Sequence, residues 1–175
     1  LMMAPDQIAD WARKVRTGSN GSIQLNTWIT DPDPGRDTAH EAEVRAFLSG
    51  WGPALQPAAA TGPAQDFDAQ CAAMLDAGPT VMSTIMGLYP PHVVEEMKAR
   101  KIKWFATVTT VAEARMAQEA GADVVIAQGM EAGGHRGAFN AEDAASRLGG
   151  LFSLLPAVVD AVDVPVVATG GIADA

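Results

Sequence analysis

The sequence predicts an α/β fold in which a parallel sheet is covered by helices. Short apolar runs of strand length alternate with segments whose apolar residues recur at helical spacing. Five such runs follow one another along the 175 residues, and several are nearly uninterrupted, as expected for strands buried on both faces. Strands and helices that alternate in this way build a parallel sheet from βα units.

The first part of the chain contains one helix, one strand and a long excursion. Apolar residues lie on one face of a helix predicted over residues 6–16, and residues 22–29 then form a strand after two glycines. Residues 30–62 are rich in Pro, Gly and Asp around a helical patch at 41–48. We interpret this segment as an excursion from the end of the strand and not as a linker between domains.

The rest of the chain alternates regularly. We expect helices at 66–77, 92–100, 111–120 and 154–162, and strands at 80–86, 104–108, 123–127 and 164–168. Thr110 and Glu113 have the spacing of a capping box at the start of one helix, and Gly121 suits the position after its end.

A (β/α)₈ TIM barrel is the expected fold, here an incomplete portion of about five βα units. The chain begins on a helix and stops after a strand, whereas a complete barrel needs about 250 residues. We therefore expect residues 1–175 to be a single partial barrel domain, without the N-terminal strands and the strand-eight segment, and with a loop and helix excursion at about 30–65.

Composition excludes several function classes. The formal net charge is −9 and no basic cluster is present, which argues against nucleic-acid binding. The single cysteine, Cys71, excludes an internal disulfide, fits a reducing cytoplasm, and is expected to be a small buried hydrophobe. No apolar run approaches the ~20 residues of a membrane span, and no signal-peptide pattern begins the chain. We expect a cytoplasmic location and no membrane partner.

A glycine-rich loop from Gln128 to Gly137 follows the predicted strand at 123–127. Ligands of parallel α/β folds bind at the carboxyl ends of strands, and bare backbone N–H groups there suit a phosphate or a flavin edge. His135 lies inside this loop, where an imidazole can act as a base at neutral pH. Glu131 and Arg136 are expected to brace the loop, as members of ion pairs, more than to catalyse.

Other candidate residues carry weaker signals. Gly170 and Gly171 follow the last strand, a position that suits the phosphate site of many barrels. His40 and His92 are interpreted as solvent-facing or packing residues. The chain shows no zinc-ligand spacing, P-loop, Ser-His-Asp order or GxGxxG motif, so no metal is predicted.

The segment from Gly121 to Gly137 closely resembles the signature of the nitronate monooxygenase family, formerly called 2-nitropropane dioxygenases. The segment from Val164 to Asp174 looks like the family's phosphate-loop segment. Weaker matches are the strand ending at Asn26 and the segments 81–87 and 105–109, whereas residues 30–62 have no obvious counterpart.

This resemblance implies an FMN-dependent barrel oxidoreductase. The residues that match its cofactor-binding positions are Asn26 at the flavin ring, Gln128 at the flavin edge, Gly133 and Gly134 beside the cofactor, and Gly170 and Gly171 at its phosphate. His135 matches the catalytic histidine, which deprotonates a nitroalkane or pairs with the bound nitronate. The implied partners are a small nitronate or nitroalkane and O₂; a homodimer is left open.

Two rival interpretations remain. A flavin-dependent enoyl-acyl carrier protein reductase shares the Gly-Gly-His loop, although Gln128 and Arg136 favour the nitronate branch. The second rival is a barrel without flavin, or an inactive barrel-derived binding module. The resemblance also implies that the first two strands and part of the phosphate site lie outside these 175 residues. We therefore expect this portion alone to bind FMN poorly, which leaves its own activity open.

Overall fold

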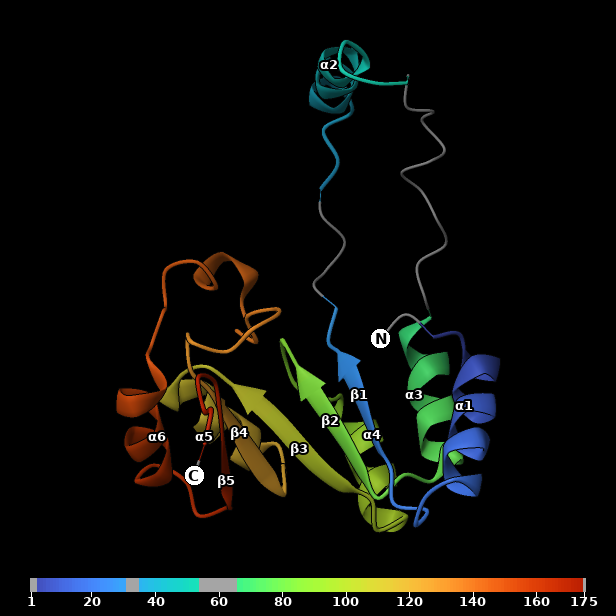
Figure 1. Ribbon diagram of the computed structural model, residues 1–175, viewed down its shortest axis with the longest axis vertical. Coiled ribbons are helices and arrows are strands. Elements are labelled where there is room, and N and C mark those ends of the chain that lie inside the picture. The colour runs from blue at the N-terminus through green and yellow to red at the C-terminus, as the bar shows by residue number, and fades with distance from the viewer. Residues whose placement is uncertain (1–2, 31–34, 54–65, 175) are drawn as a thin grey trace. The chain divides into compact units, whose positions relative to one another are not determined.

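A computed structural model describes residues 3–30, 35–53 and 66–174 of the chain (Figure 1). The chain divides into two compact units, one made of residues 1–30 and 67–175 and the other of residues 31–66. The first unit contains the sheet and the predicted site. The second unit covers the segment in which the excursion was expected.

The first unit is built on one five-stranded parallel sheet. Its strands are β1 (Gln24–Trp28), β2 (Val81–Ile85), β3 (Lys103–Val108), β4 (Val124–Gln128) and β5 (Val166–Thr169). The strands lie side by side in the order in which they occur in the chain, and every neighbouring pair is parallel. Sequential parallel order with a helix in each connection is the winding of a (β/α)₈ barrel, so the prediction of a partial barrel is confirmed.

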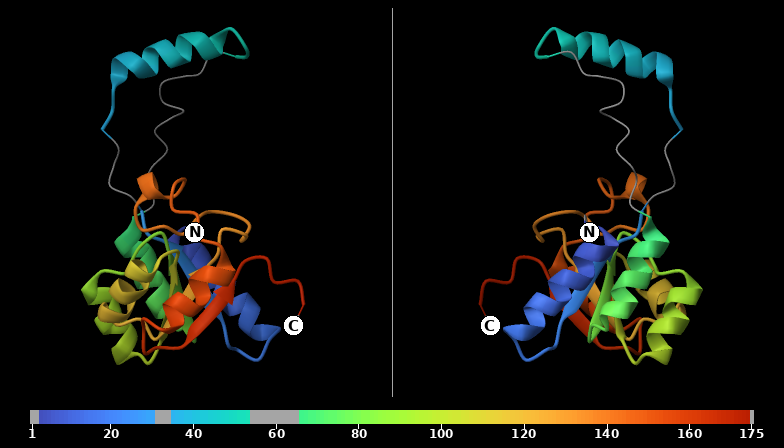
Figure 2. Two further views of the ribbon diagram at one scale, coloured as in Figure 1. Left: turned by 90° about the vertical axis from the view of Figure 1, so that its left-hand side faces the viewer. Right: turned by 90° about the vertical axis from the view of Figure 1, so that its right-hand side faces the viewer.

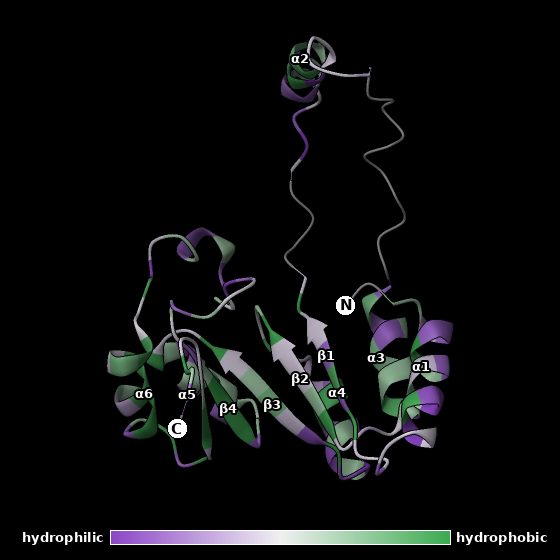
Figure 3. Ribbon diagram, in the orientation of Figure 1, coloured by the Kyte–Doolittle hydropathy of each residue, from purple (hydrophilic) through white to green (hydrophobic). Residues whose placement is uncertain are grey.

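Helices connect and cover the strands. They are α1 (Pro5–Thr17), α3 (Phe67–Ala77), α4 (Pro91–Ala99), α5 (Val111–Glu119) and α6 (Leu151–Val159). In Figure 3, purple hydrophilic segments of α1 alternate with green hydrophobic ones, which is the pattern of a helix with one buried face. The capping box of α5 is present, because Thr110 accepts a hydrogen bond from the Glu113 amide.

One predicted helix has the wrong bounds. Residues 154–162 were expected to be helical, whereas α6 begins at Leu151 and ends at Val159. The Leu151 amide donates to the carboxylate of Glu131, which lies in the preceding loop. A helix N-terminus has free amide groups, and a carboxylate from elsewhere in the chain can satisfy them. Local sequence therefore gave no signal for this start.

The two faces of the sheet differ in burial. On the helix-covered face, Leu25, Met82, Trp104 and Val125 are buried. Strand residues alternate between faces, so the residues between them point to the opposite face, where Phe105 and its neighbours on β4 are only half-buried. This second face corresponds to the interior of a barrel.

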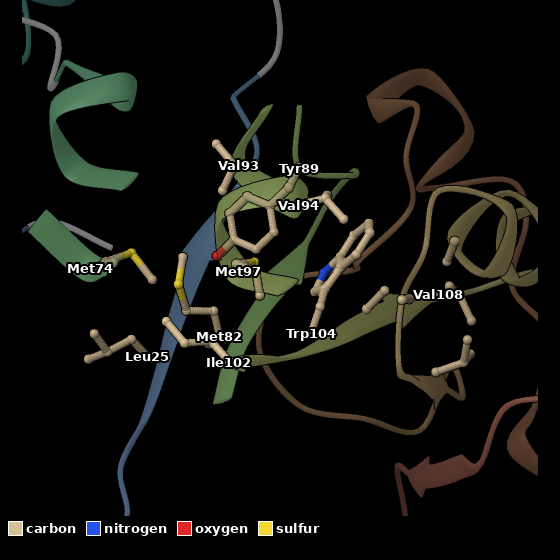
Figure 4. Close-up of a cluster of buried hydrophobic side chains, with 14 of the residues drawn as sticks. Leu25, Met74, Met82, Tyr89, Val93, Val94, Met97, Ile102, Trp104 and Val108 are labelled. Carbon is tan, nitrogen blue, oxygen red and sulfur yellow. The ribbon is translucent and has the colours of Figure 1, made fainter. Parts of the chain in front are cut away.

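The core is a cluster of apolar side chains between the sheet and the helices. Figure 4 shows Met82 and Trp104 of the sheet together with Val93, Val94 and Met97 of α4. The Trp104 indole N–H donates to Thr84 Oγ1 over 3.1 Å, and its ring lies 5.7 Å from that of Tyr89. Indole groups buried in this way combine a large apolar area with a satisfied donor.

Cys71 lies in the same core, on α3. Its side chain is buried, as predicted for a small hydrophobe, and burial raises the pKa of the thiol to about 12. A thiol with so high a pKa is almost fully protonated at neutral pH and is a poor nucleophile.

The second unit contains one helix, α2 (Thr38–Ser49). The Asp37 side chain caps its N-terminus by accepting from the amides of Ala39 and His40. No residue of α2 is buried, and Phe47 and Trp51 expose 65% and 80% of their surface. Nowhere in the described ranges does a helix have the length and apolar character needed to cross a membrane.

Candidate functional site at the carboxyl ends of the strands

The loop after β4 lies at the end of the sheet toward which the strands run. Figures 1 and 2 show this loop, in orange, above the tips of the strand arrows in three orientations. The predicted site is therefore at the carboxyl ends of parallel strands, where ligands of such folds bind. Contacts within the loop show how its residues are held there.

Gln128, the last residue of β4, anchors the loop by its side chain. Its Nε2 donates to the backbone oxygen of His135 over 3.0 Å, and its Oε1 accepts from the Gly137 amide over 2.7 Å. The side chain is buried, and its two bonds fix the backbone on both sides of Arg136. An amide nitrogen has a second hydrogen to donate, so these contacts leave Gln128 one donor for a ligand.

Arg136 braces the loop through backbone oxygens. Its guanidinium donates to the backbone oxygen of Gln128 over 2.9 Å and to that of Arg147 over 3.1 Å. Its Nε is buried and lacks a partner among the described residues. The prediction of a bracing role agrees with these bonds, but the expected ion pair is not what holds Arg136: its partners are neutral carbonyl groups.

Glu131 braces the other end of the loop. Its carboxylate accepts from the Leu151 amide at the start of α6, with distances of 3.1 and 2.9 Å to its two oxygens. This backbone hydrogen bond is the main reason why the pKa of Glu131 lies below its usual value, and Arg136 lowers it further at longer range. Glu131 is therefore a helix cap and not a member of an ion pair.

Gly137 brings the loop down onto the uncovered face of the sheet. A Cβ built on Gly137 would lie 3.1 Å from atoms of Ile85 and Thr107 and 3.2 Å from Gln128 Oε1, and these residues are the last of β2, the last but one of β3 and the last of β4. The backbone at Gly137 thus approaches three strand tips more closely than a residue with a side chain could.

The side chain of His135 consequently lies against the end of β1. We call the region between the strand tips and the loops that follow them the mouth. Its ring centroid lies 4.5 Å from that of Trp28, with 47° between the ring planes. Trp28 is the last residue of β1, and β2 and β3 lie between β1 and β4 in the sheet. The side chain of His135 is exposed, as are those of His40 and His92 on α2 and α4. Of the three histidines, His135 is the one at the strand tips.

A buried carboxylate holds the far end of the same segment. Glu113 on α5 accepts from the amide and hydroxyl of Thr109 and from the amide of Phe139. One side chain thus ties the end of β3 to the segment that follows Gly137. The sequence identified Glu113 only as a capping residue, and the bond to Phe139 had no signal in the sequence.

Gly170 and Gly171 lie beside the loop, after β5. Gly170 has φ of +120°, and a Cβ there would lie 2.9 Å from the Ala132 amide nitrogen, so the two loops approach at their backbones. Together with Gln128 and Gly133, the two glycines line a pocket of about 510 Å³. A Cβ on Gly133 or Gly134 would meet no atom within 4 Å, which leaves their backbone open to a ligand.

Asn26 lies apart from this pocket, on β1. Its Oδ1 accepts from Ser83 Oγ over 2.9 Å, and Ser83 accepts in turn from Gln24 Nε2. Asn26 and Trp28 share the uncovered face of β1, because residues two apart on a strand point to the same side. The predicted residues therefore form two groups: Gln128, Gly133, Gly170 and Gly171 around the pocket, and His135 near β1. Trp28 was missed, although its alternation with Asn26 would have placed it on this face.

The fold and these two loops define a protein of the (β/α)₈-barrel class with a candidate ligand site at the carboxyl ends of its strands. The family model described as "Nitronate monooxygenase" matches residues 2–175. The chain belongs to the nitronate monooxygenase family.

Individual relatives agree with this assignment. A "Probable nitronate monooxygenase" of Staphylococcus aureus (strain Newman) is 31% identical over 172 residues, which cover 96% of this chain and 48% of the relative. One of Staphylococcus saprophyticus is 46% identical over 104 residues, covering 58% and 29%. The chain spans about half the length, or less, of the curated relatives that it matches.

Solved structures are similar over nearly the whole chain. A nitroalkane oxidase from Streptomyces ansochromogenes superposes with a TM-score of 0.76 at 32% identity, covering 94% of this chain and 48% of its own. FabK from Thermotoga maritima superposes with a TM-score of 0.66 at 25% identity, covering 99% and 42%.

Proposed function

We propose that the protein containing this chain is an FMN-dependent nitronate monooxygenase, which oxidises alkyl nitronates and nitroalkanes with O₂ to a carbonyl compound and nitrite. The observation that carries the proposal is the arrangement at the strand tips. An exposed imidazole lies in the same loop as Gly133, which lines a pocket with Gln128, Gly170 and Gly171. Family membership supports the same reaction.

The residues present fit a flavin mononucleotide. Gly133 and Gly134 offer backbone with no atom near it, and the pocket that Gly133 lines with Gly170 and Gly171 has Gln128 and Thr169 as its polar side chains. Gly170 and Gly171 would hold the phosphate, with Gln128 at the flavin edge and Asn26 at the ring. When bound, FMN would supply the one-electron oxidation of the nitronate, with O₂ as the co-reactant for cleavage of the C–N bond.

The chain itself would supply the proton transfer. A neutral nitroalkane must lose the proton on its α-carbon before it becomes a nitronate, and a nitrogen of the His135 imidazole would accept that proton. The resulting imidazolium would lie beside the negative charge of the nitro group and stabilise it. Arg136 and Glu131 would act on this step only by holding the loop, since their side chains bond backbone groups.

Oxygen uptake tests the proposal against its two rivals. The full-length protein, loaded with FMN, is expected to consume O₂ and release nitrite with propionate 3-nitronate, and to oxidise NADH slowly with an enoyl thioester. Rapid NADH oxidation by the thioester without nitronate-dependent uptake would instead identify the reductase. A colourless protein that takes up no added FMN, without absorbance near ~450 nm, would indicate a barrel without flavin.

A further inference from the structure

Trp28 and His135 form an aromatic pair, although β2 and β3 lie in the sheet between the strands to which they belong or which they follow. Trp28 belongs to β1 and His135 to the loop after β4, yet their ring centroids are 4.5 Å apart. The separation and the 47° tilt lie in the range of favourable aromatic pairs. Because β2 and β3 separate β1 from β4, this contact depends both on how Trp28 is placed at the end of β1 and on how the loop after β4 is held.

The position of Trp28 is fixed by its strand. The Ile29 amide donates to the Ile85 oxygen over 3.0 Å, and Trp28 is in register with Ile85. The indole therefore projects from the uncovered face at the tip of a strand that is paired along its length. Trp28 exposes 37% of its surface, so its side chain lines the open end of the sheet and is not part of the core.

The backbone of His135 is fixed, but its ring has few restraints. Gln128 holds the His135 backbone oxygen, and Gly137 sits on three strand tips. The His135 imidazole makes no side-chain hydrogen bond to any described residue, and the Trp28 indole is its one ring contact there. A general base needs a defined orientation relative to the proton it takes. Among the described residues, the Trp28 indole is the group whose contact can set the orientation of the His135 imidazole.

We propose that Trp28 is the positioning residue for His135: its indole holds the imidazole in the tilt that leaves the ring nitrogens free at the mouth. This inference rests on the proposed function, because it concerns the proton transfer assigned to His135. Trp28 acts through His135, so its loss affects the substrate that must be deprotonated. A nitronate, which has already lost that proton, depends on the pair much less.

The test uses the full-length, FMN-loaded protein with three variants. Trp28→Leu removes the aromatic ring, Trp28→Phe retains one, and Trp51→Leu is the matched control at another exposed tryptophan, in the second unit. Trp28 is partly exposed, so its truncation leaves no closed cavity, and a thermal melt of each variant checks folding.

The first readout is the NMR signal of His135 in protein labelled with ¹³C at histidine Cε1, assigned by its loss in His135→Gln. An indole tilted against the imidazole at this distance shifts that signal through its ring current. Trp28→Leu is expected to move the signal, Trp28→Phe to move it less, and Trp51→Leu to leave it in place. An unmoved signal in Trp28→Leu overturns the inference, whatever the protein's activity proves to be.

The second readout compares a neutral nitroalkane with its nitronate. Trp28→Leu is expected to lower kcat for the nitroalkane about 3- to 10-fold, the range that one aromatic pair can supply, with KM nearly unchanged. Trp28→Phe restores most of the rate, and the nitronate is oxidised almost normally. Equal losses on both substrates contradict a positioning role. A wild-type protein that oxidises neither substrate overturns the proposed function, while the NMR signal still decides whether the rings are paired.

Discussion

The two faces of the sheet have different roles: one packs against the helices, and the other carries the candidate site. The face covered by helices is closed: Met82, Trp104 and Val125 are buried there among side chains of the helices. The opposite face is partly open and ends in the pair of Trp28 and His135 and the glycine-rich pocket. Residues that alternate along one strand thus serve stability on one side and the site on the other. Stability and activity should therefore respond to different substitutions.

The largest expected effect is on the closed face. Trp104→Ala removes a buried indole that contacts Tyr89 and donates to Thr84, and should lower the free energy of unfolding by about 3–5 kcal/mol. Urea denaturation of the full-length protein measures the loss. The fraction that remains folded should keep its kcat. A stable Trp104→Ala variant with low kcat would mean that the two faces are not separable in this way.

Next in size is a change at the open face. Gly133→Ala adds a methyl group where no protein atom lies within 4 Å, so the protein should fold normally while FMN affinity falls about tenfold through lost contact with the pocket backbone. Titration followed by flavin fluorescence measures the affinity. Gly18→Ala, also in open space but at the end of α1, is the control and should bind FMN normally. Equal affinity in both variants would remove Gly133 from the cofactor site.

The smallest expected effect concerns the hydrogen bond between the glycine-rich loop at the open face and helix α6 at the closed face. Glu131 accepts a hydrogen bond from the first residue of α6, and its pKa is lowered in the folded protein mainly for that reason. A lowered folded pKa stabilises the protein above the unfolded pKa of about 4.3, and this stability is lost as pH falls through the folded pKa.

Glu131→Gln should therefore lower Tm slightly at pH 7 and have less effect on Tm at low pH, where the wild-type carboxylate is protonated. Thermal melts of both proteins across pH measure the difference. A difference in Tm that stays constant from pH 7 down to pH 3 would show that the charge of Glu131 is not what stabilises the start of α6.

Much of the closed face could be predicted from sequence. Apolar runs and helical spacing located every strand and α-helix of the sheet unit, because burial on two faces leaves a continuous apolar run and burial on one leaves a periodic one. The short 3-10 helix Ala141–Asp143 was not predicted. The start of α6 was missed because its cap, Glu131, lies in the preceding loop. Caps supplied from a distance leave no local pattern.

The open face was predicted only in part. Glycines and a histidine after strands marked the pocket and His135, since bare backbone at strand ends is a local feature. The partners of these residues were not visible, because they come from other strands. Trp28 meets His135 only after the sheet has formed, and Glu113 reaches Phe139 in the same way. The roles of the predicted cofactor-binding residues stay predictions: Asn26, Gln128, Gly133, Gly134, Gly170 and Gly171.

The central claim is that His135 is the base that deprotonates the substrate at this mouth. The most direct measurement is the ratio of kcat/KM for a neutral nitroalkane to that for its nitronate in His135→Asn, with bound FMN verified by absorbance. We expect FMN to remain bound and the ratio to fall by about 10²- to 10⁴-fold, the usual contribution of a general base. An unchanged ratio would contradict the claim and remove His135 from the chemistry.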